Sequence, residues 1–129
     1  MRVLESVLYA EDLVAARQFY TGVLQLEEIM FDPERDLFLR CEVSVLIIFK
    51  SSKTVIHDSI VPPHGTVGAG HLAFAATEKE MAEWEQRLSK NQVEIIDRIT
   101  WPNGARSIYF RDPAGNILEF ATPNLWNLK

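Results

Sequence analysis

The chain has 129 residues, of which 47% are hydrophobic, so it can bury a core without disulfides or a structural metal. Its net charge of −5 at pH 7 argues against nucleic-acid binding, because phosphate recognition needs clustered Lys and Arg side chains. The sequence shows no run of about 18 apolar residues and no signal-peptide pattern. We therefore expect a cytoplasmic protein, and the single Cys41 excludes an internal disulfide.

The first half of the chain predicts a strand, a helix and three further strands. A strand is expected at 2–9, and Asp12 is placed to cap the following helix. Strands are then predicted at 27–32, 36–41 and 43–50. The helix carries apolar residues at helical spacing, namely Leu13, Ala16, Tyr20, Val23 and Leu24.

The second half repeats this order. A strand at 70–76 leads to a helix that Thr77 and Glu80 open as a capping box and that Asn91 ends. The apolar stripe of this helix consists of Met81, Trp84 and Leu88. Further strands are predicted at 93–100, 105–111 and 116–122. The expected fold class is therefore α+β, with two βαβββ modules in one domain, 1–129.

A connector separates the two modules. Module one spans 1–50, the connector 51–69 and module two 70–123, with a C-terminal tail at 124–129. The connector contains several Pro and Gly residues and shows no clear period, so we predict a loop, and loops of this length are usually functional. Its two histidines, His57 and His64, are expected to be exposed to solvent rather than to form a lid.

Three side chains that can bind metal interrupt apolar strands. They are Glu5, His71 and Glu119. Because an unpaired buried carboxylate is costly, a shared cation is the simplest partner for them. Aligning the two modules sets Glu5 against His71, and Ile47 against Glu119, so three of four equivalent positions carry ligand-type side chains.

Each of these residues also has a structural interpretation. Glu5 is an ordinary surface acid if its strand face is solvated, and a single histidine such as His71 is more often a hydrogen-bonded core residue than a ligand. Glu119 has possible ion-pair partners in Arg106 and Arg111 across a hairpin. The repeat favours the metal, because it places the three residues at equivalent positions.

The chain resembles the vicinal oxygen chelate superfamily, also called the glyoxalase/bleomycin resistance/dioxygenase family. The resemblance rests on the βαβββ duplication, on the segments Glu11–Leu13 and Phe19–Leu24, and on the run Ser107–Asn116 followed by Glu119. It implies that each module curls into a half-barrel, that two modules face each other across a cleft, and that small members form homodimers by exchanging modules.

The same resemblance implies the residues of the site. Glu5, His71 and Glu119 would bind a divalent metal (Mn, Fe, Ni, Zn or Mg), with Ile47 where four-ligand glyoxalases have a glutamate. Three ligands leave coordination positions open for a small-molecule substrate. Glu119 and Tyr109 are the candidate catalytic residues. The candidate substrate-binding residues are Trp101, Asn103, Arg106, Ser107 and Tyr109.

The candidate substrate-binding residues also have structural interpretations. Tyr109 is equally interpretable as an aromatic residue of the sheet, and the turn 101–107 as a solvated hairpin loop. The turn 112–116 is predicted to be a hairpin turn that directs Glu119.

For the protein as a whole, the sequence predicts a metal-dependent enzyme of the glyoxalase or fosfomycin-resistance type, acting as a lyase, an isomerase or a catalyst of thiol or water addition. The rival is a metal-free protein that sequesters a drug or metabolite, as bleomycin-resistance proteins do. An extradiol dioxygenase is disfavoured, because Glu5 stands where that group has a histidine.

Overall fold

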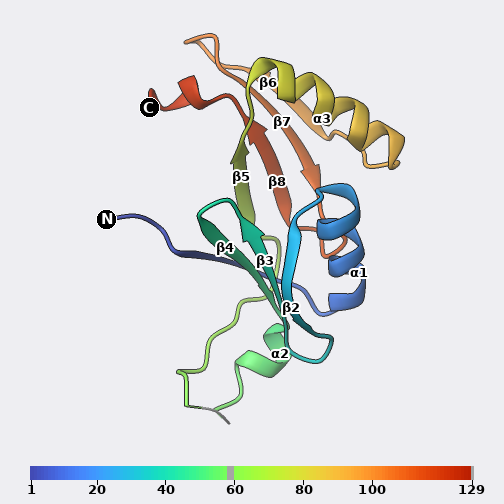
Figure 1. Cartoon of the computed structure of the whole chain (residues 1–129), viewed down its shortest axis with the longest axis vertical. Coiled ribbons are helices and arrows are strands. Elements are labelled where there is room, and N and C mark those ends of the chain that lie inside the picture. Colours follow the sequence, from blue (N-terminus) through green and yellow to red (C-terminus); the bar gives the residue numbers. More distant parts are fainter. Residues whose placement is uncertain (58–59, 129) are drawn as a thin grey trace. The chain divides into compact units, whose positions relative to one another are not determined.

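The computed structural model in Figure 1 describes residues 1–57 and 60–128. The chain divides into two compact units, Met1–Gly70 and His71–Lys129. Each unit contains a four-stranded mixed sheet with helices, so the predicted α+β fold of two βαβββ modules is confirmed. Within the described residues, every helix is too short or too polar to cross a membrane.

In the first unit, the strand order is β1-β4-β3-β2, with β1 parallel to β4 and the other pairs antiparallel. The strands are β1 (Glu5–Tyr9), β2 (Glu27–Asp32), β3 (Asp36–Cys41) and β4 (Ser44–Phe49). The helices are α1 (Leu13–Arg17), the π-helix η1 (Gln18–Val23) and α2 (Ser51–Thr54).

The helix after β1 starts where the sequence predicts. The Asp12 Oδ1 atom accepts a hydrogen bond from the backbone N–H of Ala15 at 2.9 Å, which satisfies a free donor of the first turn. The helix then widens into η1, where the N–H of Leu24 donates to the carbonyl of Phe19, five residues back. The apolar residues predicted for a single helix are therefore distributed over α1 and the π-helix η1.

In the second unit, the strand order is β5-β8-β7-β6, and β5 is parallel to β8. The strands are β5 (His71–Ala75), β6 (Asp97–Thr100), β7 (Arg106–Arg111) and β8 (Ile117–Ala121). The helices are α3 (Glu78–Lys90) and the short 3-10 helix η2 (Pro123–Leu125).

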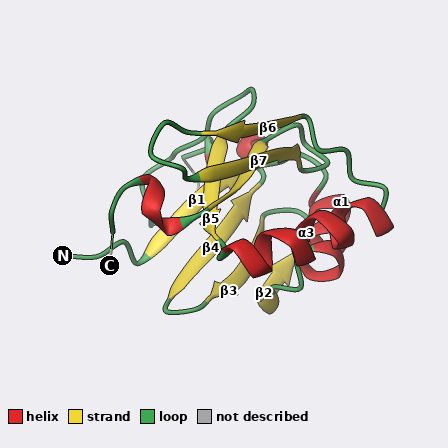
Figure 2. Ribbon diagram, turned by 90° about the horizontal axis from the view of Figure 1, so that it is seen from above, coloured by secondary structure: helices red, strands yellow, loops and turns green. Residues whose placement is uncertain are grey.

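Helix α3 covers one face of the second sheet. The predicted capping box is present, because Thr77 Oγ1 accepts from the N–H of Glu80 at 3.2 Å, and Asn91 is the C-cap. Its Trp84 stacks on Phe120 of β8. Figures 1 and 2 show α3 on one side of this sheet and the C-terminal segment on the other.

The first and last strands of each unit pair in the same register in both units. In the first, Val7 of β1 is the partner of Ile47 of β4, and in the second Ala73 of β5 is the partner of Glu119 of β8. Each partner on the first strand lies two residues after the candidate ligand, Glu5 or His71. The structure therefore confirms the predicted alignment of the two halves.

The connector departs from the prediction in two ways. It begins with α2, which the sequence did not indicate. His64 is also not simply exposed: its Nδ1 lies 2.7 Å from the Tyr9 hydroxyl, and its ring lies 4.8 Å from that of Phe49. The adjoining Gly65 packs so tightly that a Cβ atom there would lie 2.5 Å from Val55 Cγ1. This part of the connector is therefore a packed element of the first unit. His57 is exposed, as expected.

Candidate functional site

The candidate site lies on the face of the second sheet that α3 leaves open. Strand register places His71, Glu119 and Tyr109 on this face, because Ala73 and Tyr109 are the strand partners of Glu119 and side chains alternate along each strand. The neighbouring residues Leu118 and Phe120 point to the opposite face and are buried. Glu119 is therefore the one polar residue of β8, on the face opposite Leu118 and Phe120.

A hydrogen-bonded turn fixes the start of β8. Asp112 Oδ1 accepts from the N–H groups of Ala114 and Asn116, both at 2.9 Å, and Gly115 has a φ of 87°, which favours glycine. The predicted hairpin turn is thus present. Since it ends three residues before Glu119, it sets the register that turns this carboxylate toward the open face.

His71 and Glu119 form the centre of the site. His71 Nε2 lies 3.2 Å from Glu119 Oε2, and Glu119 is only 5% exposed. The other ring nitrogen, Nδ1, lies 3.0 Å from the carbonyl oxygen of Ile117, a geometry in which it donates its hydrogen. That bond directs the lone pair of a neutral imidazole, on Nε2, at the carboxylate.

This arrangement fits a divalent cation. Two electron-rich atoms, Nε2 and Oε2, face each other, and the second carboxylate oxygen, Oε1, is buried without a hydrogen-bond partner. A buried oxygen of this kind costs free energy unless a cation or a proton compensates it. The backbone bond at Nδ1 is also the usual outer support of a metal-binding histidine.

The structure brings together two of the three predicted ligands. Within the described residues, no group of three or more His, Cys, Asp or Glu side chains is close enough to hold a metal ion. The third candidate, Glu5, is the first residue of β1 in the other unit, where it is exposed and shares a strand face with Val7 and Tyr9. Ile47, the residue at the position equivalent to Glu119, is buried in the first unit.

Tyr109 lies beside the pair. Its ring is stacked against the His71 imidazole, with centroids 6.2 Å apart and planes at 25°. Burial, followed by the negative charge of Glu119, raises the pKa of the Tyr109 phenol. The hydroxyl therefore stays protonated near neutral pH and can donate a hydrogen bond to an oxygen of a bound molecule.

These three residues open into a cavity of about 740 Å³. Most of its wall is apolar, and part of it comes from the tail after β8. The remaining lining residues are Ala73, Phe74, Ala75, Trp101, Ala121, Thr122, Pro123, Leu125, Trp126 and Leu128. The position of the tail could not be predicted from the sequence, because its residues show no strand or helix period.

The turn after β6 positions Trp101 rather than presenting several ligand-binding groups. The Trp101 indole N–H donates to Ser107 Oγ at 2.9 Å, and Ser107 is buried. Asn103 uses its amide N–H₂ to hold the tail, donating to the Asn124 carbonyl at 3.0 Å and to that of Leu125 at 3.4 Å. Ser107 and Asn103 thus support two walls of the cavity.

Arg106 is not brought to this face. Being next to Ser107 on β7, it points to the side of α3, where its Nη1 lies 2.8 Å from Glu78 Oε2 and its Nη2 lies 3.9 Å from Glu85. Among the described residues, the lining of the cavity includes no Lys or Arg. The alternative in which Glu119 pairs with Arg106 is therefore not what the structure shows, and this candidate substrate-binding residue instead pairs with α3.

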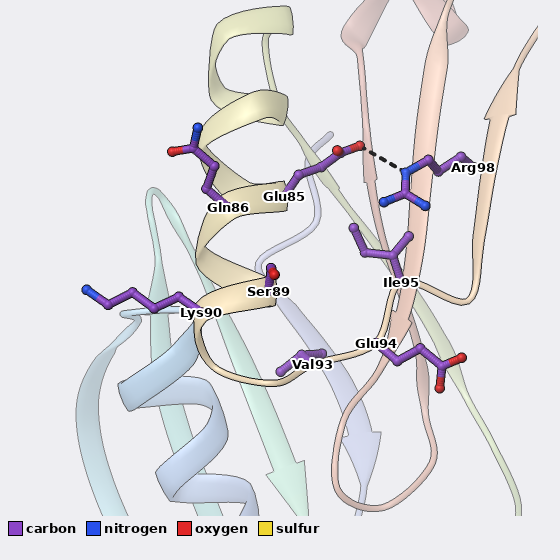
Figure 3. A pocket seen from close by; sticks show the side chains of 8 residues that line it. All are labelled: Glu85, Gln86, Ser89, Lys90, Val93, Glu94, Ile95 and Arg98. Carbon is purple, nitrogen blue, oxygen red and sulfur yellow. Dashed lines mark hydrogen bonds and ion pairs between the residues drawn. The ribbon is translucent and has the colours of Figure 1, made fainter.

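A second groove lies between the C-terminal half of α3 and the segment leading to β6 (Figure 3). It mixes two cations, Lys90 and Arg98, with the acids Glu85 and Glu94, and its described lining contains no aromatic side chain. Arg98 Nε is 3.4 Å from Glu85 Oε1, so part of this charge is already paired. The first cavity is the better candidate for a small-molecule site.

Two βαβββ units, each a four-stranded mixed sheet with helices, define a class of two-module α+β proteins. The sequence model of the Glyoxalase/Bleomycin resistance protein/Dioxygenase superfamily matches residues 2–120. The chain belongs to this superfamily, as its sequence motifs indicated.

Individual solved structures have the same fold. The crystal structure of lactoylglutathione lyase from Agrobacterium tumefaciens superposes with a TM-score of 0.96 and 36% identity, covering 99% of this chain and 98% of that one. A virulence protein from Salmonella typhimurium, with a TM-score of 0.72 and 22% identity over 95% of this chain and 96% of that one, shows the shared fold alone.

A curated relative matches a shorter part. Metallothiol transferase FosB from Staphylococcus saprophyticus is 41% identical over 56 residues, which are 43% of this chain and 37% of that protein. The FosB of Staphylococcus epidermidis matches over the same length at 39% identity, covering 43% of this chain and 39% of that protein. The matched segment spans less than half the length of these relatives.

Proposed function

We propose that the protein is a divalent-metal-dependent enzyme acting on a small molecule with two adjacent oxygen atoms. The observation that carries this proposal is the pair His71–Glu119, in which Nε2 and Oε2 face each other at 3.2 Å while the buried Oε1 atom has no partner. A proton on Nε2 would join these two atoms in one hydrogen bond but would leave Oε1 without a partner. A cation satisfies both and makes use of Oε1 as well.

The residues have distinct roles in this proposal. His71 and Glu119 hold the ion from the second unit, and Glu5 supplies the third ligand from a first unit. Two carboxylates and a neutral imidazole balance the charge of a divalent ion. When bound, the ion supplies Lewis-acid polarisation of the chelated oxygens. Tyr109 donates its hydroxyl hydrogen to the substrate oxygen that gains negative charge, and so orients the substrate beside Glu119.

The names of the relatives guide the reaction class. One is a lyase whose name refers to a glutathione derivative, and the other is a metallothiol transferase. Both names suggest a thiol or thiol adduct as a reactant. We therefore propose lyase or thiol-transfer chemistry. Ile47 argues against the four-ligand type of glyoxalase, since the missing glutamate belongs to the acid–base pair in that type.

We further propose a homodimer with exchanged modules, in which Glu5 of one chain completes the site formed by His71 and Glu119 of the other. The support is the exposure of Glu5 on β1 and of the second sheet's open face. Two such chains would form two equivalent sites related by a two-fold axis.

Metal analysis tests this function. Protein purified without an affinity tag and dialysed should contain about one divalent ion per chain, and Glu5→Gln, His71→Ala and Glu119→Gln should each lose it while staying folded. Val43→Ala, at an exposed turn, is the control and should keep the metal. Unchanged metal content in all three variants would refute the ligand assignment.

The apolar wall of the cavity also suits a second function, the sequestration of a drug or metabolite without metal. Trp101, Leu125 and Trp126 offer stacking and apolar contact that need no cation. Under this alternative, the purified protein contains no bound metal, and ligand affinity is the same with and without divalent ions.

A further inference from the structure

The two units fill equivalent positions with side chains of very different size. In the first unit, Tyr9 and Phe49 are strand partners, and their rings lie 6.4 Å apart. The equivalent strand partners in the second unit are Ala75 and Ala121. Both alanines line the cavity described above. The cavity therefore occupies the place that two aromatic rings fill in the other half of the chain.

Aromatic and aliphatic side chains border this space. Trp101 is fixed on one side by its bond to Ser107, and the tail contributes Leu125, Trp126 and Leu128. Trp126 is 74% exposed, and Leu128 is 72% exposed, so both present large apolar surfaces to an incoming molecule. Such a lining binds rings or alkyl groups through apolar burial and stacking.

The tail is held in place rather than loosely attached. Asn103 donates to the carbonyls of Asn124 and Leu125, and Thr122 Oγ1 accepts from the N–H of Arg106 at 2.9 Å. Each of these bonds joins a side chain to a backbone group, so the wall that contains Trp126 exists before any ligand binds. Preorganisation of this kind lowers the entropy cost of binding.

The apolar part of the cavity does not suit one class of ligand. A small phosphonate or phosphate needs cationic partners, but the described lining includes no Lys or Arg, and Arg106 is engaged by Glu78 on the other face. The ionisable side chains of the described lining, His71, Tyr109 and Glu119, form the proposed metal end of the site, and the Thr122 hydroxyl already accepts a hydrogen bond from the backbone N–H of Arg106.

From these observations we infer that the cavity is a subsite for an aromatic or branched alkyl group, and that the substrate is an amphipathic molecule whose adjacent oxygens face His71 and Glu119 while its apolar part lies between Trp101 and Trp126. This inference rests on the proposed function. The ligand that fits is about one or two rings in size, and compact phosphonates are poor ligands for this half of the site.

Two matched probes test the subsite. Acetohydroxamate and benzohydroxamate have the same chelating hydroxamate group. The first carries a methyl group and the second a phenyl ring. Their affinities are measured by calorimetry and by tryptophan fluorescence, on protein loaded with Mn²⁺ and on metal-free protein. Benzohydroxamate should bind the wild type at least about 10-fold more tightly than acetohydroxamate, because its phenyl ring is buried in the cavity.

Variants then locate the effect. Ala75→Tyr places in the second unit the side chain that Tyr9 has in the first, and should fill the cavity. Trp126→Ala removes an exposed wall, and Asn103→Asp keeps the acceptor for the N–H of Ala105 while losing the donor to the tail. Each should reduce the preference for benzohydroxamate to about 3-fold or less, whereas Val43→Ala should leave it unchanged.

The outcomes separate the subsite from the metal chemistry. Equal affinity of both probes for the wild type, with metal-dependent binding intact, overturns the subsite and leaves the proposed function standing. Affinities that do not depend on metal, with the phenyl preference still lost in Ala75→Tyr and Trp126→Ala, overturn the proposed function and support the subsite. A phenyl preference that survives in all three variants also overturns the subsite.

Discussion

Trp84 of α3 stacks on Phe120 of β8, with ring centroids 4.5 Å apart and planes at 16°. Phe120 directly follows Glu119, whose side chain points to the other face of the same strand. The stack therefore holds the strand that carries the buried carboxylate, and the helix stabilises the site through the sheet rather than by direct contact.

Trp84→Ala should therefore lower the free energy of unfolding by about 3 kcal/mol, because it removes a large packed side chain from beneath β8. The measurement is urea unfolding followed by circular dichroism. Trp84→Phe keeps an aromatic ring and should lose less than half as much. A loss within 0.5 kcal/mol for Trp84→Ala, the usual range of an exposed surface substitution, would show that the stack contributes little.

Glu119→Gln should stabilise the metal-free protein. The variant removes a buried charge, and the new amide N–H₂ can donate to His71 Nε2, so we expect a gain of about 1 kcal/mol at pH 9, where histidine side chains in general are uncharged. Thermal unfolding in EDTA measures this gain. The opposite result, a loss of stability, would show that the Glu119 carboxylate supports the metal-free fold and would argue against a role confined to metal binding.

Asp36 should make stability depend on pH. Its carboxyl group is 9% exposed, its Oδ1 has no hydrogen-bond partner, and burial, followed by the charge of Asp32, raises its pKa. A raised pKa in the folded state means that stability is highest when the group is protonated and falls as pH rises through the folded pKa.

Asp36→Asn should consequently stabilise the protein by about 0.5–1 kcal/mol at pH 7, and this gain should disappear below about pH 4, where the wild-type carboxyl group is protonated in both states. Denaturant unfolding at several pH values provides the measurement. Glu83→Gln, at an exposed position of α3 in the other unit, is the control for a general change in charge. A gain that is constant from pH 3 to pH 7 would argue against titration of Asp36.

Tyr109→Phe should weaken binding of chelating ligands to the metal-loaded protein by about 1–3 kcal/mol, the range for a hydrogen bond to a charged oxygen. Metal content should not change, because the ring and its stacking on His71 remain. Calorimetry with acetohydroxamate, together with metal analysis, checks both statements. Loss of metal from this variant would instead make Tyr109 part of the ligand set.

Complementation tests the exchanged dimer. Glu5→Ala and His71→Ala chains should each be unable to bind metal as homodimers. When they are unfolded, mixed and refolded together, each mixed dimer should recover about one competent site, with two intact ligands from one chain and Glu5 from the other. A monomeric mass at micromolar concentration, with metal bound, would contradict this assembly.

The sequence predicted the duplicated fold and most strand positions, because alternating apolar residues and turn signals were clear. The strands at 27–32 and 36–41 have the predicted bounds, and Asp12 and Thr77 cap their helices as expected. Helix α2 was missed, since Ser51–Thr54 is too short to show a period.

The site was predicted less completely. His71, Glu119 and Tyr109 share a face as strand alternation requires, and the same alternation could have shown that Arg106 and Ser107 point to opposite faces. The tail carries no periodic signal, and its position depends on the bonds from Asn103, which connect residues about twenty positions apart. Contacts of that kind cannot be deduced from one local pattern.

The two copies of the repeat differ in the size of two equivalent side chains. The first copy has Tyr9 and Phe49 where the second has Ala75 and Ala121, so the two copies have different roles. In the first copy the rings pack against each other and against His64, so changes there cost stability. In the second copy the two alanines border the cavity. A larger side chain there changes which ligands the cavity can hold, and it removes no ring contacts of the kind found in the first copy. Evolution of ligand preference in this chain should therefore proceed through one half of the duplication, while the other half preserves the fold.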